Sequence, residues 1–243
     1  MTLLALALVL AAAFLHATWN LLAKRAQGAA EFVWLFATLT LVAYAPAVVA
    51  YLLIAHPVVR GVQVLFAAVS SVIHVGYFVT LQRGYRAGDL SLVYPLARGS
   101  GPALAALCCC VWRGAEACTS RASTTSATTR TGDSPPLLYS YLSEAGRALL
   151  LAPVAWRGRG AVAAAWRESR GAAWGIAVLS PLAYILVLTA MTFTPISLVA
   201  PAREISILVG TLMGTRLLAE GQGSRRLVGA LGMVAGVALL ALA

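Results

Sequence analysis

Two arginines lie inside runs of residues that are otherwise apolar enough to cross a membrane. Arg98 follows the sequence SLVYPLA, and Arg203 follows the closely similar sequence SLVAPA. An arginine at the centre of a membrane helix costs about 2.5–3.5 kcal/mol on insertion scales, so its presence indicates a polar partner. We interpret Arg98 as an anchor for a carboxylate or another anionic group. An ion pair with Glu204 and a side chain that reaches the membrane interface are the alternatives.

Two further sets of polar and aromatic residues have helical spacing. His16, Trp19 and Asn20 are three and four residues apart, and His74 and Tyr77 are three apart. Residues at these spacings share one helix face, so each set can line a pore. Interhelical hydrogen bonds, or a tryptophan at the membrane interface, explain the same spacing equally well.

Two prolines and one adjacent charge pair complete the candidate site. Pro95 and Pro201 each remove a backbone donor within an apolar run, which predicts either a broken helix that lines the site or a packing kink. Arg203 and Glu204 point about 100° apart on a helix, so we expect one of them to address the cavity. The substrate-path candidates are Arg98, Tyr94, Pro95, His16, Trp19, Asn20, His74, Tyr77, Pro201, Arg203 and Glu204.

The composition indicates an all-α integral membrane protein. Of 243 residues, 60% are hydrophobic and 11% are charged, and the mean hydropathy is +0.85. Such a chain has too few polar residues to cover a soluble domain. Because no basic residue precedes Lys24, we expect the first run to be a helix and not a signal peptide. The eight predicted spans are Thr2–Ala23, Phe32–Ala55, Gly61–Gln82, Leu90–Trp112, Pro136–Trp156, Gly171–Phe193, Pro195–Thr215 and Leu227–Ala243. In the fifth span, Glu144 and Arg147 lie on one helix face, so we expect their charges to neutralise each other in part.

The net charge of +10 is best explained by membrane topology and not by nucleic-acid binding. Basic residues accumulate on the cytoplasmic side of membrane proteins. The loops after the first, third, fifth and seventh spans lie on the same side of the membrane. They hold eleven of the 18 basic residues: Lys24, Arg25, Arg83, Arg86, Arg157, Arg159, Arg167, Arg170, Arg216, Arg225 and Arg226. Only Arg60, Arg113, Arg121 and Arg130 fall on the other side. Both termini are therefore predicted to lie outside the cytoplasm.

The stretch Arg113–Pro135 interrupts the apolar pattern. Ten of its 23 residues are Ser or Thr, which is typical of a disordered linker. The four cysteines, Cys108, Cys109, Cys110 and Cys118, lie in or just before it without CxxC spacing, and no histidine follows. We therefore predict no metal site and no cofactor.

The two SLVxP sequences indicate an internal repeat. The first opens the fourth predicted helix and the second opens the seventh, so the copies cross the membrane in opposite directions. Inverted repeats of transporters place the substrate site near the membrane midplane, where the halves meet. We predict a first repeat of four helices at 1–112, a linker at 113–135 and a second repeat of four helices at 136–243.

Three stretches carry a resemblance to a known family. HATWNLLAKRA at His16–Ala26, GDLSLVYPLARGSGP at Gly88–Pro102 and SLVAPAREISILVGTLMGTRLLAEG at Ser197–Gly221 resemble the EamA-type transporters of the drug/metabolite transporter superfamily. The resemblance implies ten helices in two inverted halves of five. It also implies secondary transport, as an exporter, of small metabolites, amino acids or drug-like compounds. Relative to that pattern, helices five and six are absent and the Ser/Thr-rich stretch stands in their place.

The expected partners are therefore the lipid bilayer and a small-molecule substrate, not nucleic acid, and a homodimer is compatible with this interpretation. Seventeen arginines against one lysine indicate a bacterial gene, so we expect a multi-pass protein of the bacterial cytoplasmic membrane. A non-functional transporter remnant left by a frameshift or deletion is the main alternative, and a membrane subunit is another. We predict no enzyme activity, because HExxH is absent and no motif supplies a histidine partner for Ser100.

Overall fold

The computed structural model describes residues 3–57, 61–111, 136–194, 199 and 202–242. Within these ranges the chain forms eight α-helices and no strand, as the sequence predicts. The helices are α1 (Leu3–Ala26), α2 (Ala30–Ala55), α3 (Gly61–Ala87), α4 (Leu90–Val111), α6 (Pro136–Arg157), α7 (Arg159–Phe193), α9 (Ile205–Leu217) and α10 (Gly223–Leu242). The predicted disorder of Arg113–Pro135 and the prediction for Pro201 concern residues outside these ranges.

Four of these helices are long and apolar enough to cross a membrane. They are α1, α2, the segment Gln63–Ala87 of α3, and α7. At 1.5 Å per residue each exceeds the hydrocarbon thickness of about 30 Å. Helix α9 is also apolar but has only 13 residues. By length and composition, the chain has the helices of a multi-pass membrane protein.

Helix α7 begins earlier than the sequence predicts. The basic stretch from Arg159 to Arg170 was expected to be a loop, but it is helical, and the helix is interrupted only at Ser169 (φ −132°, ψ 23°). The run AVAAA at 161–165 explains the helix, because alanine has the highest helix propensity. The sequence prediction of a loop here was therefore wrong, and only the break at Ser169 marks the start of the apolar part.

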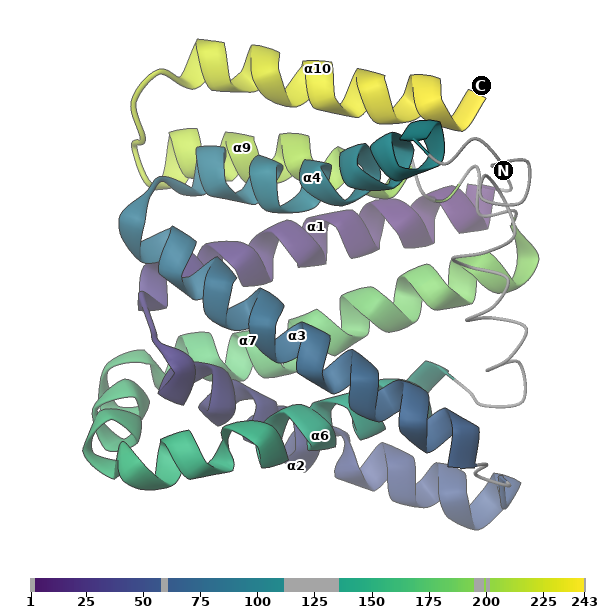
Figure 1. The fold of residues 1–243 in the computed structure, drawn as a ribbon, viewed down its shortest axis with the longest axis vertical. Coiled ribbons are helices and arrows are strands. Elements are labelled where there is room, and N and C mark those ends of the chain that lie inside the picture. The colour runs from purple at the N-terminus through teal and green to yellow at the C-terminus, as the bar shows by residue number, and fades with distance from the viewer. Residues whose placement is uncertain (1–2, 58–60, 112–135, 195–198, 200–201, 243) are drawn as a thin grey trace. The chain divides into compact units, whose positions relative to one another are not determined.

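The helices form two compact units, and each combines segments from both halves of the sequence. Unit 1 contains α1 up to Leu21, α4, the end of α7 from Leu182, α9 and α10. Within it α4, α9 and α10 pack against one another (Figure 1). Small and branched apolar residues of α1 and α7 form its core with one residue that precedes α9: Val9, Ala12, Val187, Ala190 and Val199.

Unit 2 contains the end of α1 from Leu22, α2, α3, α6 and α7 up to Pro181. Here α6 packs against both α2 and α3 (Figure 1). The rings of Phe36 and Phe78 join α2 to α3 with centroids 5.4 Å apart. At the α3–α6 contact, Ser71 Oγ donates to the Ser143 carbonyl oxygen at 3.0 Å. A Cβ on Gly146 would clash with Ser71 Oγ, so glycine permits this close approach.

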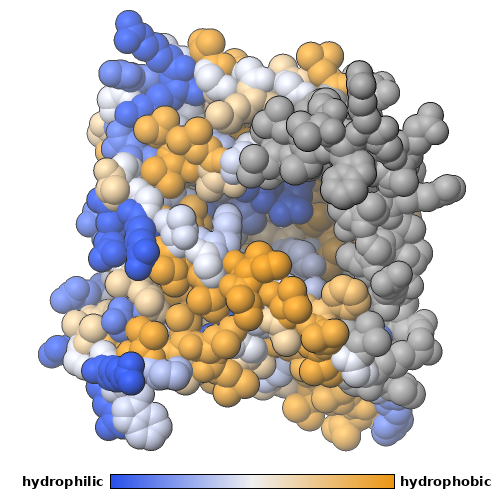
Figure 2. Space-filling view, viewed as in Figure 1, coloured by the Kyte–Doolittle hydropathy of each residue, from blue (hydrophilic) through white to orange (hydrophobic). Residues whose placement is uncertain are grey.

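One face of α3 carries an exposed apolar patch, visible as the orange surface of this helix in Figure 2. Contiguous apolar surface of this kind marks a protein or membrane contact. The patch residues are Val64, Leu65, Phe66, Val69, Val72 and Ile73.

Candidate functional site

The structure divides the sequence-predicted site residues between the two units. Unit 1 holds His16, Trp19 and Asn20 on α1, Tyr94, Pro95 and Arg98 on α4, and Arg203 and Glu204 directly before α9. Unit 2 holds His74 and Tyr77 on α3. Most of the predicted site therefore lies within unit 1, and the α3 pair belongs to a different set of contacts.

Arg98 and Glu204 form an ion pair that links the two SLVxP segments. Arg98 Nη2 lies 3.5 Å from Glu204 Oε1, and the two side chains are only 9% and 11% exposed. This distance is long for a charge-assisted hydrogen bond, which is typically about 2.7–2.9 Å. Arg98 Nε and Nη2 and Glu204 Oε2 make no hydrogen bond to any residue that the structure describes. The pair thus keeps hydrogen-bonding capacity for another group.

Helix α4 brings Arg98 to this position without a break. It runs continuously from Leu90 to Val111, so Pro95 does not interrupt it. Pro95 itself is buried. The structure therefore does not support a broken helix at Pro95 and is consistent with a packing role for this residue.

His16 lies beside this pair with one ring nitrogen bonded and the other not. Trp19 Nε1 donates to His16 Nδ1 at 3.1 Å, which assigns the proton of a neutral imidazole to Nε2. Nε2 is buried and has no hydrogen-bond partner among the described residues. The ring centroid lies 6.2 Å from that of Tyr94. Asn20 Nδ2 donates to the His16 carbonyl oxygen at 2.7 Å, so the three α1 candidates share one face as predicted.

Positive charge exceeds negative charge in this cluster. Arg98 and Arg203 both lie close enough to His16 to interact with it electrostatically, and Arg203 interacts with Arg98, Glu204 and Tyr94. Among the described residues of this cluster, two guanidinium groups thus interact with one carboxylate, that of Glu204. An apolar interior that holds an excess cation and unbonded N–H donors suits a carboxylate or another anion.

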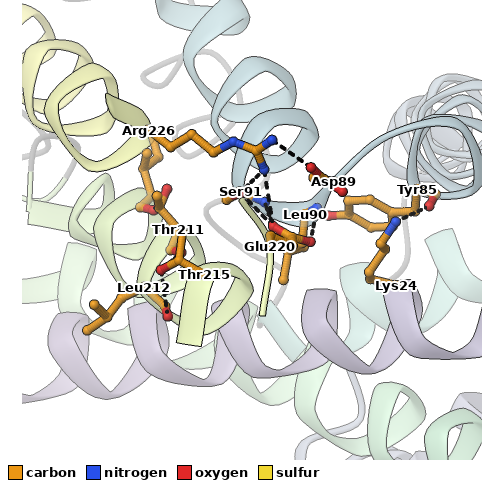
Figure 3. Close-up of polar contacts among 11 residues, drawn as sticks. Lys24, Tyr85, Asp89, Leu90, Ser91, Thr211, Leu212, Thr215, Glu220 and Arg226 are labelled. Carbon is orange, nitrogen blue, oxygen red and sulfur yellow. Dashed lines mark hydrogen bonds and ion pairs between the residues drawn. The ribbon is translucent and has the colours of Figure 1, made fainter. Parts of the chain in front are cut away.

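A second polar network in unit 1 fixes the start of α4 (Figure 3). The Glu220 carboxylate accepts from the backbone N–H of Leu90 at 2.6 Å and of Ser91 at 2.8 Å. It therefore bonds two of the backbone N–H groups that the first turn of a helix leaves without an intrahelical acceptor. Arg226 Nη2 of α10 pairs with Asp89 at 2.6 Å, and its Nη1 lies 3.6 Å from Glu220.

The backbone around Glu220 is shaped for this contact. Ala219 (φ 53°) and Gln222 (φ 59°) adopt the left-handed conformation, which turns the chain sharply between α9 and α10. A Cβ on Gly214 would lie 2.6 Å from Glu220 Oε2 and 2.9 Å from Ser91 N. Glycine at position 214 therefore allows α9 to approach the first turn of α4.

Sequence reasoning did not select Glu220, Asp89 or Arg226 as functional residues. Asp89 directly before α4 is a helix-start signal that could have been noted. The partner of the first turn could not have been found in this way, because Glu220 is 129 residues away from Ser91.

Unit 2 contains its own buried charge pair. Arg147 Nη2 donates to Glu144 Oε1 at 2.6 Å, which confirms the predicted neutralisation on one face of α6. The Arg147 guanidinium lies over the Phe78 ring, 4.2 Å from its centroid. His74, on the same helix as Phe78, stacks on that ring and contacts Ser70. His74 and Tyr77, the two candidates on α3, thus lie near the Glu144–Arg147 pair, which the sequence did not identify as a site.

No family model, curated protein or solved structure matches the chain significantly.

Proposed function

We propose that the chain is a secondary transporter, working as an exporter, of small metabolites, amino acids or drug-like compounds across the bacterial cytoplasmic membrane. Three features support this proposal: the long apolar helices, the buried polar cluster of unit 1, and the resemblance of three motifs to EamA-type transporters. Buried ionisable residues in membrane helices are costly and mark substrate or ion pathways.

The single observation that carries the proposal is the loose Arg98–Glu204 pair. A pair with only a structural role is expected to saturate its hydrogen bonds, because unbonded polar atoms in an apolar interior destabilise the fold. Here the two groups stay 3.5 Å apart, and Arg98 retains unbonded donors. We therefore propose that an anionic substrate group, such as a carboxylate, binds Arg98 in competition with Glu204.

The proposal also assigns the topology. Eight helices cross the membrane in two inverted repeats, and both termini lie outside the cytoplasm, as the distribution of basic residues predicts. Alkaline phosphatase fused after Ala243 should be active, and green fluorescent protein fused at the same position should be dark. The reverse pattern would exclude this orientation.

The transport function can be tested on the purified chain in liposomes of phosphatidylethanolamine and phosphatidylglycerol. Vesicles loaded with a mixture of unlabelled L-amino acids should accumulate the same radiolabelled amino acids by exchange. Arg98→Leu should lower this exchange by about tenfold to a hundredfold. Arg216→Leu, at an exposed position in the last turn of α9, is the matched control and should retain it. Equal exchange by Arg98→Leu and the parent would remove Arg98 from the site.

The non-functional remnant is the second candidate, and the Ser/Thr-rich stretch 113–135 favours it. The repeat requires an apolar helix at that place in the first half. This candidate predicts that the parent exchanges none of the amino acids. It also predicts that a shifted reading frame of the corresponding nucleotides encodes apolar helices.

A further inference from the structure

A second buried polar cluster, in unit 2, has no role in the anion site proposed above. Glu144 and Arg147 on α6 are 6% and 3% exposed, and Ser143 beside them is 6% exposed. Helix α6 packs against α2 and α3, and at this turn Ser143 and Arg147 contact Ser71 and Phe78 of α3. Such burial would be costly for two unpaired charges, and the 2.6 Å bond between them offsets only part of that cost.

Several polar atoms of this cluster remain unbonded. Glu144 Oε2, Arg147 Nε and Ser143 Oγ are buried and have no hydrogen-bond partner among the residues that the structure describes. Glu144 therefore uses only one carboxylate oxygen toward Arg147. The other oxygen, more than nine-tenths buried as part of its side chain, is an acceptor without a donor. An unbonded carboxylate oxygen in an apolar interior is a place where a proton can bind.

Arg147 has a second support that does not depend on Glu144. Its guanidinium lies 4.2 Å from the centroid of the Phe78 ring, a distance at which a cation is attracted to an aromatic face. Arg147 can therefore keep its place when Glu144 becomes neutral. A cluster built in this way tolerates two charge states of the carboxyl group.

We propose that Glu144 is a reversible proton-binding site through which transport is coupled to a proton gradient. This inference rests on the proposed transport function. In the binding step, an O–H bond of a hydronium ion breaks, Glu144 Oε2 takes the proton and forms a new O–H bond, and the carboxylate becomes a neutral carboxylic acid while water is left. In the release step, the O–H bond breaks and the proton returns to water on the other side of the membrane. No oxidation or reduction takes part.

The surroundings favour a proton over a metal cation. Arg147 is bonded to the carboxylate, and its charge repels any metal ion that approaches Oε1. From α3, His74 interacts electrostatically with Arg147 and is a further titratable group of the cluster. From α2, Glu31 lies beside Gly158, and Tyr44 donates to the Val178 carbonyl oxygen of α7, so both are engaged elsewhere.

Infrared difference spectroscopy of the full chain in lipid tests proton binding directly. Spectra recorded in mildly acidic and mildly alkaline buffer should differ by the carbonyl stretch of a protonated carboxylic acid. Glu144→Gln should lose this band. Glu168→Gln, an exposed carboxylate on α7, is the matched control and should retain it. An unchanged band in Glu144→Gln would overturn the proposal.

Transport measurements then separate coupling from transport itself. Vesicles that contain the parent should show amino-acid uptake stimulated by a pH gradient. Glu144→Gln should keep gradient-free exchange and lose all of the stimulation. Retained stimulation in this variant would overturn the proposal while leaving the transport function intact. If the parent exchanges no amino acid, the transport function fails and coupling fails with it, whereas the infrared band still decides whether Glu144 binds a proton.

A second variant keeps the test decisive where the yield of folded Glu144→Gln protein is low. The double variant Glu144→Gln with Arg147→Met removes both charges and keeps similar side-chain volumes. It should fold, lose the infrared band and lose stimulation by the gradient. A folded double variant that keeps the band would also overturn the proposal.

Discussion

The two buried Arg–Glu pairs have the same chemistry but opposite construction. In unit 2, Arg147 and Glu144 lie one turn apart on one helix, 2.6 Å apart, with the guanidinium supported by Phe78. In unit 1, Arg98 and Glu204 come from segments more than a hundred residues apart and approach only to 3.5 Å. The first pair is assembled by one helix, whereas the second requires tertiary packing of α4 against the start of α9.

This difference predicts which property each arginine should affect most. An ion pair within one helix forms whenever that helix forms. Substituting Arg147 should therefore lower mainly the stability of the fold. A long pair that retains unbonded donors has gained little from its own interaction. Its arginine is therefore available to a ligand, and substitution there should act mainly on transport.

The largest expected effect tests the tight pair. Arg147→Met leaves the Glu144 carboxylate buried without its countercharge, and removing one partner of a buried pair typically costs about 3–5 kcal/mol. Unfolding of the purified protein in mixed micelles, titrated with sodium dodecyl sulfate, measures this loss. Glu144→Gln with Arg147→Met should recover most of it. A single variant as stable as the parent would show that the pair is not structurally important.

The loose pair should respond in the opposite way. Arg98→Leu should lower the free energy of unfolding by less than Arg147→Met does, because the pair is already 3.5 Å apart and Arg203 still interacts with the Glu204 carboxylate. Amino-acid exchange should fall by about tenfold to a hundredfold, the equivalent of one lost charged hydrogen bond of about 1.5–3 kcal/mol. Arg98→Lys should rescue it poorly, since an ammonium lacks the planar fork that binds a carboxylate with two parallel bonds.

A charge exchange separates the two interpretations of the loose pair. Arg98→Glu with Glu204→Arg preserves an ion pair but inverts its direction. If the pair is only structural, this variant should fold and transport like the parent. Folding without transport would support a binding role for Arg98.

These comparisons also show what the sequence could predict. Hydropathy alone predicts the eight helices, because each helix carries its own apolar run. The Glu144–Arg147 pair was predicted for the same reason, since both residues lie within one turn of α6. Local patterns therefore predict the features that a single helix builds.

Features built by two distant segments were predicted only as alternatives or not at all. The Arg98–Glu204 contact was one of three explanations for Arg98, because spacing along the chain does not fix which helices meet. Glu220 was missed entirely, since its role depends on the approach of α9 to α4 that Gly214 allows. The helical start of α7 was missed because its arginines suggested a loop, although its alanines favour a helix.

A third carboxylate, Glu220, extends the comparison to a group whose main partners are backbone donors. Gly214→Ala would place a Cβ 2.6 Å from Glu220 Oε2 and 2.9 Å from the backbone nitrogen of Ser91. Because the backbone cannot move aside cheaply, we expect a loss of about 1–3 kcal/mol in the free energy of unfolding. Gly229→Ala, on α10 with open space around the glycine, is the matched control and should be neutral or stabilising. A Gly214→Ala protein as stable as this control would show that the contact between Glu220 and α4 is dispensable.

The smallest expected effect concerns a pair that is more exposed than the two buried pairs, Asp89–Arg226. Its atoms are as close as those of Arg147–Glu144, at 2.6 Å, but the Asp89 side chain is 45% exposed. Solvent screens such a pair, so Asp89→Asn should lower the free energy of unfolding by at most about 1 kcal/mol. Asparagine is as good as aspartate at a helix start, so the substitution isolates the charge. Raising the salt concentration to about 1 M shortens the Debye length to about 3 Å and should abolish the difference from the parent. The loss in Arg147→Met should persist at the same salt concentration, because both partners there are buried. If the two variants instead show the same salt dependence, burial does not distinguish these pairs, and the contrast between short pairs inside and outside the apolar interior is wrong.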